Sequence, residues 1–210
     1  IESSKLTARY FDLKVGDKVI NCLPIKYIAG KMMLVRSIVL GLDLYIFPVT
    51  SSPISDLKNN YELIAFTPIQ LENSIPFIEK IKKVLVGGSP VQETLKEKIL
   101  NSKSTVYETY GMTETITHIA VKNLSMGEKE FTSLPGIEIG KRDNCLFIKP
   151  NHLSIKMVQT NDVVELTNEN KFLLIGRKDF IINSGGVKLN PESIEKKLAK
   201  YISVDFVISS

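Results

Sequence analysis

The chain has 210 residues, of which 43% are hydrophobic and 24% are charged, as in an ordinary globular domain. This composition excludes a disordered, collagen-like or disulfide-rich protein, and the length is sufficient to bury a sizeable core. The net charge of +4 comes from 27 basic and 23 acidic residues scattered along the chain, so it does not indicate nucleic-acid binding.

The first part of the sequence predicts alternating strands and helices. A helix is expected from residue 2 onward, and buried strands are expected at residues 19–24, 44–48, 62–66, 83–86 and 104–107. Helical spacing of apolar residues occupies residues 30–42, 69–74 and 91–101. Apolar strands that alternate with helices are typical of a parallel α/β sheet, which binds ligands beyond the carboxyl ends of its strands.

From about residue 117 the pattern changes to short alternating strands. They are expected at residues 118–121, 145–148, 163–166 and 172–175, separated by Gly, Asn, Asp and Pro. Pro191 and Glu192 then begin a predicted helix that runs to Leu198. The predicted fold class is therefore α/β, with a parallel-sheet subdomain flanked by helices and a small antiparallel β subdomain. The resemblance given below implies that the start of a small α+β C-terminal domain follows.

Both ends of the sequence resemble interior positions of a longer chain. The predicted opening helix is already under way at the first residues, and the sequence there does not have the pattern of a signal peptide. Residues 205–210 predict a strand without a partner, which suggests a sheet continued by further residues. Cys22 and Cys145 lie far apart in apolar surroundings, which favours buried free thiols in the reducing cytoplasm. The longest apolar stretch, residues 34–47, is too short and too charged to cross a bilayer.

The segment Glu108–Thr115 carries the strongest chemical signal. Its sequence, Glu-Thr-Tyr-Gly-Met-Thr-Glu-Thr, follows a predicted strand, and we expect a loop because Gly111 permits a tight turn. Hydroxyls suit a phosphate, a carboxylate suits its metal ion, and the Tyr110 ring suits a purine. The alternative interpretation is a polar loop capped by threonine.

Four further candidates are each ambiguous. Gly87–Pro90 either lets backbone approach a ligand or forms a tight turn. Asp162 either accepts hydrogen bonds from ribose or forms a turn, and Arg177 either holds the same sugar or makes a surface ion pair. Ser184–Gly186 either contacts a ligand or forms a β-turn.

Arg36 interrupts an apolar predicted helix. A guanidinium there needs a partner, which is either a structural carboxylate or a bound acid. His118, just after the Glu108–Thr115 segment, is either structural or catalytic. The spacing of His118, His152 and the cysteines does not fit a zinc site. The sequence contains neither a Walker-type phosphate loop nor a G-x-S-x-G elbow.

Taken in chain order, five motifs resemble the adenylate-forming superfamily, which includes acyl- and aryl-CoA ligases, luciferases and peptide-synthetase adenylation domains. The motifs are Gly87–Pro90, Tyr107–Glu114, Thr160–Asp162, Gly176–Asp179, and Ser184–Gly186 with Pro191–Glu192. Within the superfamily, Leu23–Gly30 with Arg36, and Met112–Ala120, look most like the o-succinylbenzoate–CoA ligases of menaquinone biosynthesis.

The resemblance implies an AMP-forming acid–thiol ligase. Such an enzyme uses ATP and Mg²⁺ to form an acyl-adenylate and then transfers the acyl group to CoA. The chemistry depends on positioning and charge neutralisation. The partners would be small molecules, an aryl acid with ATP and CoA, without nucleic acid or membrane insertion, and the oligomeric state stays open. Another acyl-CoA ligase, a carrier-protein adenylation domain and a non-catalytic nucleotide-binding relative are the alternatives.

The resemblance also implies residue roles. Tyr110 would stack on adenine, Thr113 would bind the α-phosphate, and Asp162 with Arg177 would hold the ribose. Thr113 and Glu114 would be catalytic, and Glu114 would hold the metal ion. The whole set that would bind ATP or AMP is Gly87, Gly88, Ser89, Pro90, Glu108, Thr109, Tyr110, Gly111, Met112, Thr113, Asp162 and Arg177.

The acyl substrate would be bound by Arg36, Tyr27 and His118, with Arg36 facing a carboxylate of o-succinylbenzoate. Asp179 would be the hinge between two domains. CoA would approach Ser184, Gly185 and Gly186. Residues 1–178 would be part of the large adenylation domain, with an α/β portion at 1–116 and a β portion at 117–178, and residues 179–210 would begin the mobile C-terminal domain.

The sequence departs from the superfamily pattern in three places. The Ser/Thr/Gly-rich phosphate loop belongs upstream of Ile1, and the C-terminal catalytic lysine belongs beyond Ser210, since neither Lys188 nor Lys196–Lys200 matches its motif. Tyr27 stands where many relatives have histidine. We therefore expect that these residues alone do not complete adenylation, whereas the whole protein does.

Overall fold

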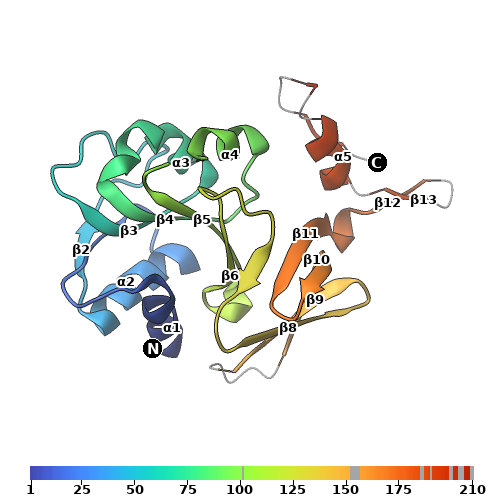
Figure 1. The fold of residues 1–210 in the computed structure, drawn as a ribbon, viewed down its shortest axis with the longest axis horizontal. Helices are drawn as coiled ribbons and strands as arrows, with labels where there is room; N and C mark the ends of the chain where they lie inside the picture. Colours follow the sequence, from blue (N-terminus) through green and yellow to red (C-terminus); the bar gives the residue numbers. More distant parts are fainter. Residues whose placement is uncertain are drawn as a thin grey trace.

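The structure is a computed structural model that describes residues 1–100, 102–151, 157–184, 187–189, 191–198, 201–202 and 206–208. Its main feature is an 11-stranded sheet with the strand order β2-β1-β3-β4-β5-β6-β7-β11-β10-β9-β8 (Figure 1). The strands are β1 (Lys18–Asn21), β2 (Asp43–Ile46), β3 (Tyr61–Phe66), β4 (Ile81–Val86), β5 (Thr105–Gly111), β6 (His118–Asn123), β7 (Phe131–Ser133), β8 (Ile137–Arg142), β9 (Cys145–Pro150), β10 (Val158–Asn168) and β11 (Lys171–Arg177). The helices are α1 (Glu2–Phe11), α2 (Ile28–Leu40), α3 (Pro68–Ser74), α4 (Glu93–Ile99) and α5 (Pro191–Leu198), with 3₁₀ turns η1 (Ile75–Lys80), η2 (Thr113–Thr115) and η3 (Lys178–Phe180).

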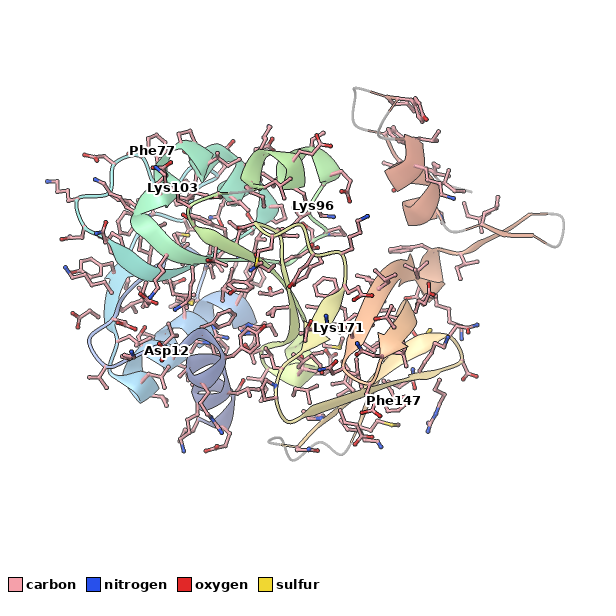
Figure 2. All side chains as sticks on the ribbon, in the orientation of Figure 1. Asp12, Phe77, Lys96, Lys103, Phe147 and Lys171 are labelled. Carbon is pink, nitrogen blue, oxygen red and sulfur yellow. The ribbon has the colours of Figure 1, made fainter. Side chains whose placement is uncertain are left out.

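Strands β1 to β5 form the parallel half of the sheet. Successive residues of a strand face opposite sides, so Val19 packs in one apolar core and Ile20 in the other. Helices α1 and α2 cover the first face, and α3 and α4 cover the second (Figure 1). Figure 2 shows side chains filling both layers, with Asp12 beside α1 and Phe77 and Lys103 on the opposite side. The predicted parallel α/β portion is confirmed.

Strands β6 to β11 form the antiparallel half. It continues the same sheet, because β6 pairs with β5 and so joins the predicted β subdomain to the parallel half. Two strands, β7 and β8, were not predicted. The residues of β8 alternate between buried Ile137, exposed Glu138 and buried Ile139, a period-2 pattern that marks a strand covered on one face.

The prediction of a loop over Glu108–Thr115 is wrong for its first half. Strand β5 runs through Gly111, and the turn is confined to the residues around η2. Gly111 serves close packing rather than a turn: a Cβ there would lie 2.6 Å from the Thr117 carbonyl oxygen and the His118 Cα. The prediction of a strand at residues 205–210 is also wrong for residues 206–208, which have no regular secondary structure. Residues 205, 209 and 210 lie outside the described residues.

After β11, the chain enters η3 and a separate two-stranded sheet of β12 (Ile182–Ser184) and β13 (Val187–Leu189), then α5. The start of α5 at Pro191 was predicted correctly. Cys22 and Cys145 are free and buried, as predicted, and burial raises the pKa of the Cys22 thiol to about 12. Among the described residues, no helix is long and apolar enough to cross a membrane.

Candidate nucleotide and acyl-substrate site

Two of the predicted motifs meet where β4 and β5 end. A Cβ on Gly87 would lie 2.4 Å from the Thr109 hydroxyl oxygen, so only glycine fits this contact. The Thr109 hydroxyl in turn donates a hydrogen bond to the Val86 carbonyl at 3.2 Å. The Gly87–Pro90 loop therefore packs directly on the strand that carries Tyr110.

The residues expected at the ribose form one cluster. Asp162 on β10 and Arg177 on β11 are direct cross-strand partners, with an N–O distance of 3.8 Å. Tyr110 donates a hydrogen bond from its hydroxyl to Asp162 Oδ2 at 2.5 Å. Arg177 also pairs with Asp179 at 2.7 Å, and Asn161 donates to both oxygens of the Asp179 carboxylate. The Arg177 hydrogen bond is the first cause that lowers the pKa of Asp179.

Thr113 and Glu114 lie on η2, beyond the end of β5, and both are exposed. The buried Thr115 hydroxyl holds this turn, because it bonds to the Met112 backbone and to the Thr117 carbonyl. The next residue, Ile116, has a φ of 67°, a strained conformation for a β-branched side chain. Strain of this kind collects at functional sites. No group of three or more His, Cys, Asp or Glu side chains that could hold a metal occurs among the described residues.

A buried basic cluster lies behind this turn. Arg36 on α2 is 4% exposed; its guanidinium donates to the Thr117 hydroxyl and to Met33 Sδ, the latter at 3.6 Å. Burial lowers the pKa of Arg36 to about 10. Its Nε has no hydrogen-bond partner, and no carboxylate forms an ion pair with it, among the residues that the structure describes. A structural carboxylate, one of the two predicted partners, is therefore absent from the described part of the chain.

His118 belongs to the same buried cluster. Its Nδ1 lies 3.4 Å from the Thr117 hydroxyl, and its ring meets the edge of Phe11 at 5.7 Å. Burial, followed by the Arg36 charge, lowers the pKa of His118 well below its ordinary value. The imidazole is therefore neutral at pH 7. Tyr27, the third residue expected here, is the N-cap residue of α2 and is 60% exposed, whereas Arg36 is buried further along the same helix.

Glu108 makes an interaction that the sequence did not reveal. Its carboxylate pairs with Lys122 on β6 at 2.7 Å, and both side chains are less than 10% exposed. Lys122 also lies 4.3 Å from the centre of the Phe131 ring. The other Glu108 oxygen accepts a long hydrogen bond, 3.5 Å, from the Val91 backbone. Lys122 and Asn161 were both missed: Lys122 comes directly after the predicted strand at 118–121, and Asn161 lies within the Thr160–Asp162 motif without a role of its own. Ser184 ends β12, whereas Gly185, Gly186 and His152 lie outside the described residues.

This arrangement can be compared with known proteins. No protein-family model matches the chain. In sequence it is 24% identical over 206 residues to the 2-succinylbenzoate–CoA ligase of Haemophilus influenzae, covering 88% of this chain and 45% of that protein. In structure it matches an AMP-forming acyl-CoA synthetase/AMP-acid ligase II-like protein of Dyadobacter fermentans. The TM-score is 0.78 and the identity 38%, over 95% of this chain and 59% of that one. The predicted resemblance to the adenylate-forming superfamily is confirmed.

A second solved structure with a similar fold is the O-succinylbenzoate coenzyme A synthetase of Bacillus subtilis in complex with ATP and magnesium ion. Its TM-score is 0.82 at 21% identity, over 94% of this chain and 49% of that one. The chain thus has the adenylate-forming fold and spans about half the length of the curated relatives that it matches. The expectation of a partial adenylate-forming fold is confirmed.

Proposed function

We propose that the protein activates o-succinylbenzoate with ATP as an acyl-adenylate and transfers it to CoA, as an AMP-forming acid–thiol ligase of menaquinone biosynthesis. The observation that carries this proposal is Arg36: a buried guanidinium without a carboxylate partner among the described residues, directly behind the Thr113–Thr115 turn. An unpaired buried charge is costly, so a bound anion is the natural partner.

o-Succinylbenzoate has two carboxylates, of which only one is activated. The second carboxylate needs a cation or hydrogen-bond donors within an otherwise apolar pocket. Arg36 offers a planar fork of donors that matches a carboxylate, and the neighbouring Thr117 hydroxyl supports it. His118 adds a neutral imidazole beside the same Thr117 hydroxyl. Exposed Tyr27 would contact the acyl substrate at the pocket entrance.

The nucleotide would bind along the carboxyl ends of β4 and β5. Asp162 and Arg177 would hold the ribose, and Thr113 would donate a hydrogen bond to the α-phosphate. The exposed Glu114 carboxylate suits Mg²⁺, which usually keeps water and phosphate oxygens as its remaining ligands. When bound, the magnesium ion would neutralise phosphate charge. The protein residues then position the acid for attack on the α-phosphorus.

The C-terminal segment would supply the second half-reaction. We place the hinge at Asp179 and the CoA-facing residues at Ser184, Gly185 and Gly186, with residues 1–178 in the large domain and 179–210 at the start of the mobile one. Asp179 is exposed and held by two short polar contacts, from Arg177 and Asn161. Contacts of this type break at little cost, which suits a pivot between two poses. We place the enzyme in the cytoplasm.

The test measures pyrophosphate release by the full-length protein with ATP, Mg²⁺ and a panel of aromatic acids. We expect release only when an acid is present, and most rapidly with o-succinylbenzoate. If pyrophosphate is released most rapidly with a different acid, that acid is the substrate and the o-succinylbenzoate assignment is wrong. No release with any acid, together with measurable AMP binding, would favour the non-catalytic nucleotide-binding alternative.

The role of Arg36 has its own test. Arg36→Ala should raise the KM for o-succinylbenzoate on the order of 10- to 1,000-fold, because it removes a charge-assisted hydrogen bond in a buried site. The KM for ATP should change little, and Arg36→Lys should recover only part of the loss. Lys31→Ala, an exposed cation on the same helix, is the matched control and should leave both constants unchanged. An unchanged acid KM in Arg36→Ala would contradict the assignment.

A further inference from the structure

We infer that the Tyr110 hydroxyl positions Asp162 for the two ribose hydroxyls, so that Tyr110 controls recognition of the sugar. The inference rests on the proposed function, in which Asp162 binds the ribose. It gives Tyr110 a role different from the stacking on adenine expected from its ring. The evidence is the set of contacts that surrounds the Asp162 carboxylate and the Tyr110 ring.

The Asp162 carboxylate is held from one side and open on the other. Tyr110 donates to Oδ2 at 2.5 Å, from a strand far away in sequence. The backbone N–H of Asp162 donates to the Thr160 hydroxyl at 3.1 Å, and that hydroxyl donates to the Leu146 carbonyl at 2.8 Å. The remaining oxygen, Oδ1, lies 3.8 Å from Arg177. The side chain of Asp162 is 13% exposed, so it reaches solvent without being free to swing.

The Tyr110 ring cannot move away from this contact. It is 8% exposed and packs edge-on against Phe172 at 5.3 Å and at a tilt against Phe131 at 5.8 Å. Little of its surface remains for a purine. Burial, followed by the hydrogen bond to Asp162, raises the pKa of Tyr110 strongly, so the hydroxyl stays protonated and remains a donor.

A carboxylate can accept from both hydroxyls of a ribose only in one orientation. Holding Oδ2 through the phenol fixes this orientation before the nucleotide arrives, which saves the cost of ordering the side chain on binding. The gain applies only to ligands that carry the two hydroxyls. A nucleotide without them should bind equally well whether or not the phenol is present.

This difference provides the experiment. Binding of AMP and of 2′,3′-dideoxy-AMP to the full-length protein is measured by calorimetry, for the wild type and for Tyr110→Phe. We expect Tyr110→Phe to weaken AMP binding about 10- to 150-fold, as for a lost hydrogen bond to a charged group. Binding of the dideoxy nucleotide should stay within about two-fold, and Tyr110→Phe should add no further loss in an Asp162→Ala background. Thermal denaturation verifies that each variant is folded.

Tyr107→Phe is the matched control. It removes a hydroxyl from the same strand, but its ring packs against Phe11 in the core covered by α1. It should leave both affinities unchanged. If the wild type binds both nucleotides equally, the proposed ribose role of Asp162 fails, and the inference fails with it. If the wild type prefers AMP and Tyr110→Phe keeps that preference, or weakens both ligands equally, the inference alone is overturned.

Discussion

Two buried cations of this protein, Lys122 and Arg36, have opposite surroundings. Lys122 lies 2.7 Å from the Glu108 carboxylate and over the Phe131 ring, so its charge is compensated within the sheet. Arg36 is equally buried, but its described neighbours are a hydroxyl, a thioether and a second basic side chain, His118. Lys122 thus has a compensating carboxylate within the sheet, whereas Arg36 has none among the described residues. A buried cation without such a partner marks a candidate site for an anionic ligand.

The largest effect is expected at Lys122. Lys122→Met should lower the free energy of unfolding by about 3–5 kcal/mol, because it leaves the Glu108 carboxylate buried without its cation. The double variant Glu108→Gln with Lys122→Met should recover most of this loss, since a neutral amide can still accept from the Val91 N–H. Chemical denaturation measures each step.

The chain offers an exposed counterpart of this pair. Glu138 and Lys149 are also cross-strand partners 2.7 Å apart, but their side chains are 56% and 41% exposed. Lys149→Met should therefore cost less than about 1 kcal/mol. Equal losses in Lys122→Met and Lys149→Met would show that burial does not distinguish the two pairs.

At Arg36 we expect a substitution to change the binding of the acid substrate but to change the stability of the fold only slightly. Arg36→Met keeps an unbranched side chain of similar length, so the free energy of unfolding should fall by less than about 1 kcal/mol or should rise. The KM for the acid substrate should still increase, as in Arg36→Ala. A large loss of stability with an unchanged KM would instead make Arg36 a structural residue like Lys122.

The last effect concerns the pH dependence of stability and needs no substitution to be observed. The unfolded chain binds a proton at His118 below about pH 6.5, whereas the folded protein resists protonation until a much lower pH. The free energy of unfolding should therefore fall as the pH drops below about 6.5, with a contribution from His118 of about 1.4 kcal/mol per pH unit. Arg36→Met should reduce the total loss, because the Arg36 charge helps to lower this pKa. His118→Gln, measured by denaturation across the same pH range, should remove the contribution.

Much of the fold could be predicted because its signals are local. The carboxyl-terminal parts of β3 and β4 are covered on both faces, so Leu63–Phe66 and Val84–Val86 appear in the sequence as short apolar runs. The Gly87–Pro90 segment and the motif around Tyr110 could also be recognised from their residue types. Strand β7 escaped prediction because three residues are too few to show a period.

The parts of the site that could not be predicted from the sequence depend on contacts between segments that are distant in the chain. Lys122 looks like an ordinary charged residue until β6 pairs with β5 and places it opposite Glu108. In the sequence Gly111 suggests a turn, yet glycine is needed there because the backbone of Thr117 and His118 passes too close for a side chain. Asn161 meets Asp179 only because β10 and β11 form a hairpin that ends at η3.

Strand β7 is the narrowest link in the sheet. It is three residues long and pairs through two register positions with β6 and two with β11, whereas β10 and β11 pair over six. Native-state opening follows boundaries where few hydrogen bonds must break. Strands β8 to β11 can therefore exchange their amide protons as one unit while β1 to β6 stay closed. Since Tyr110 and Asp162 lie on opposite sides of β7, a nucleotide that bridges them would slow this exchange.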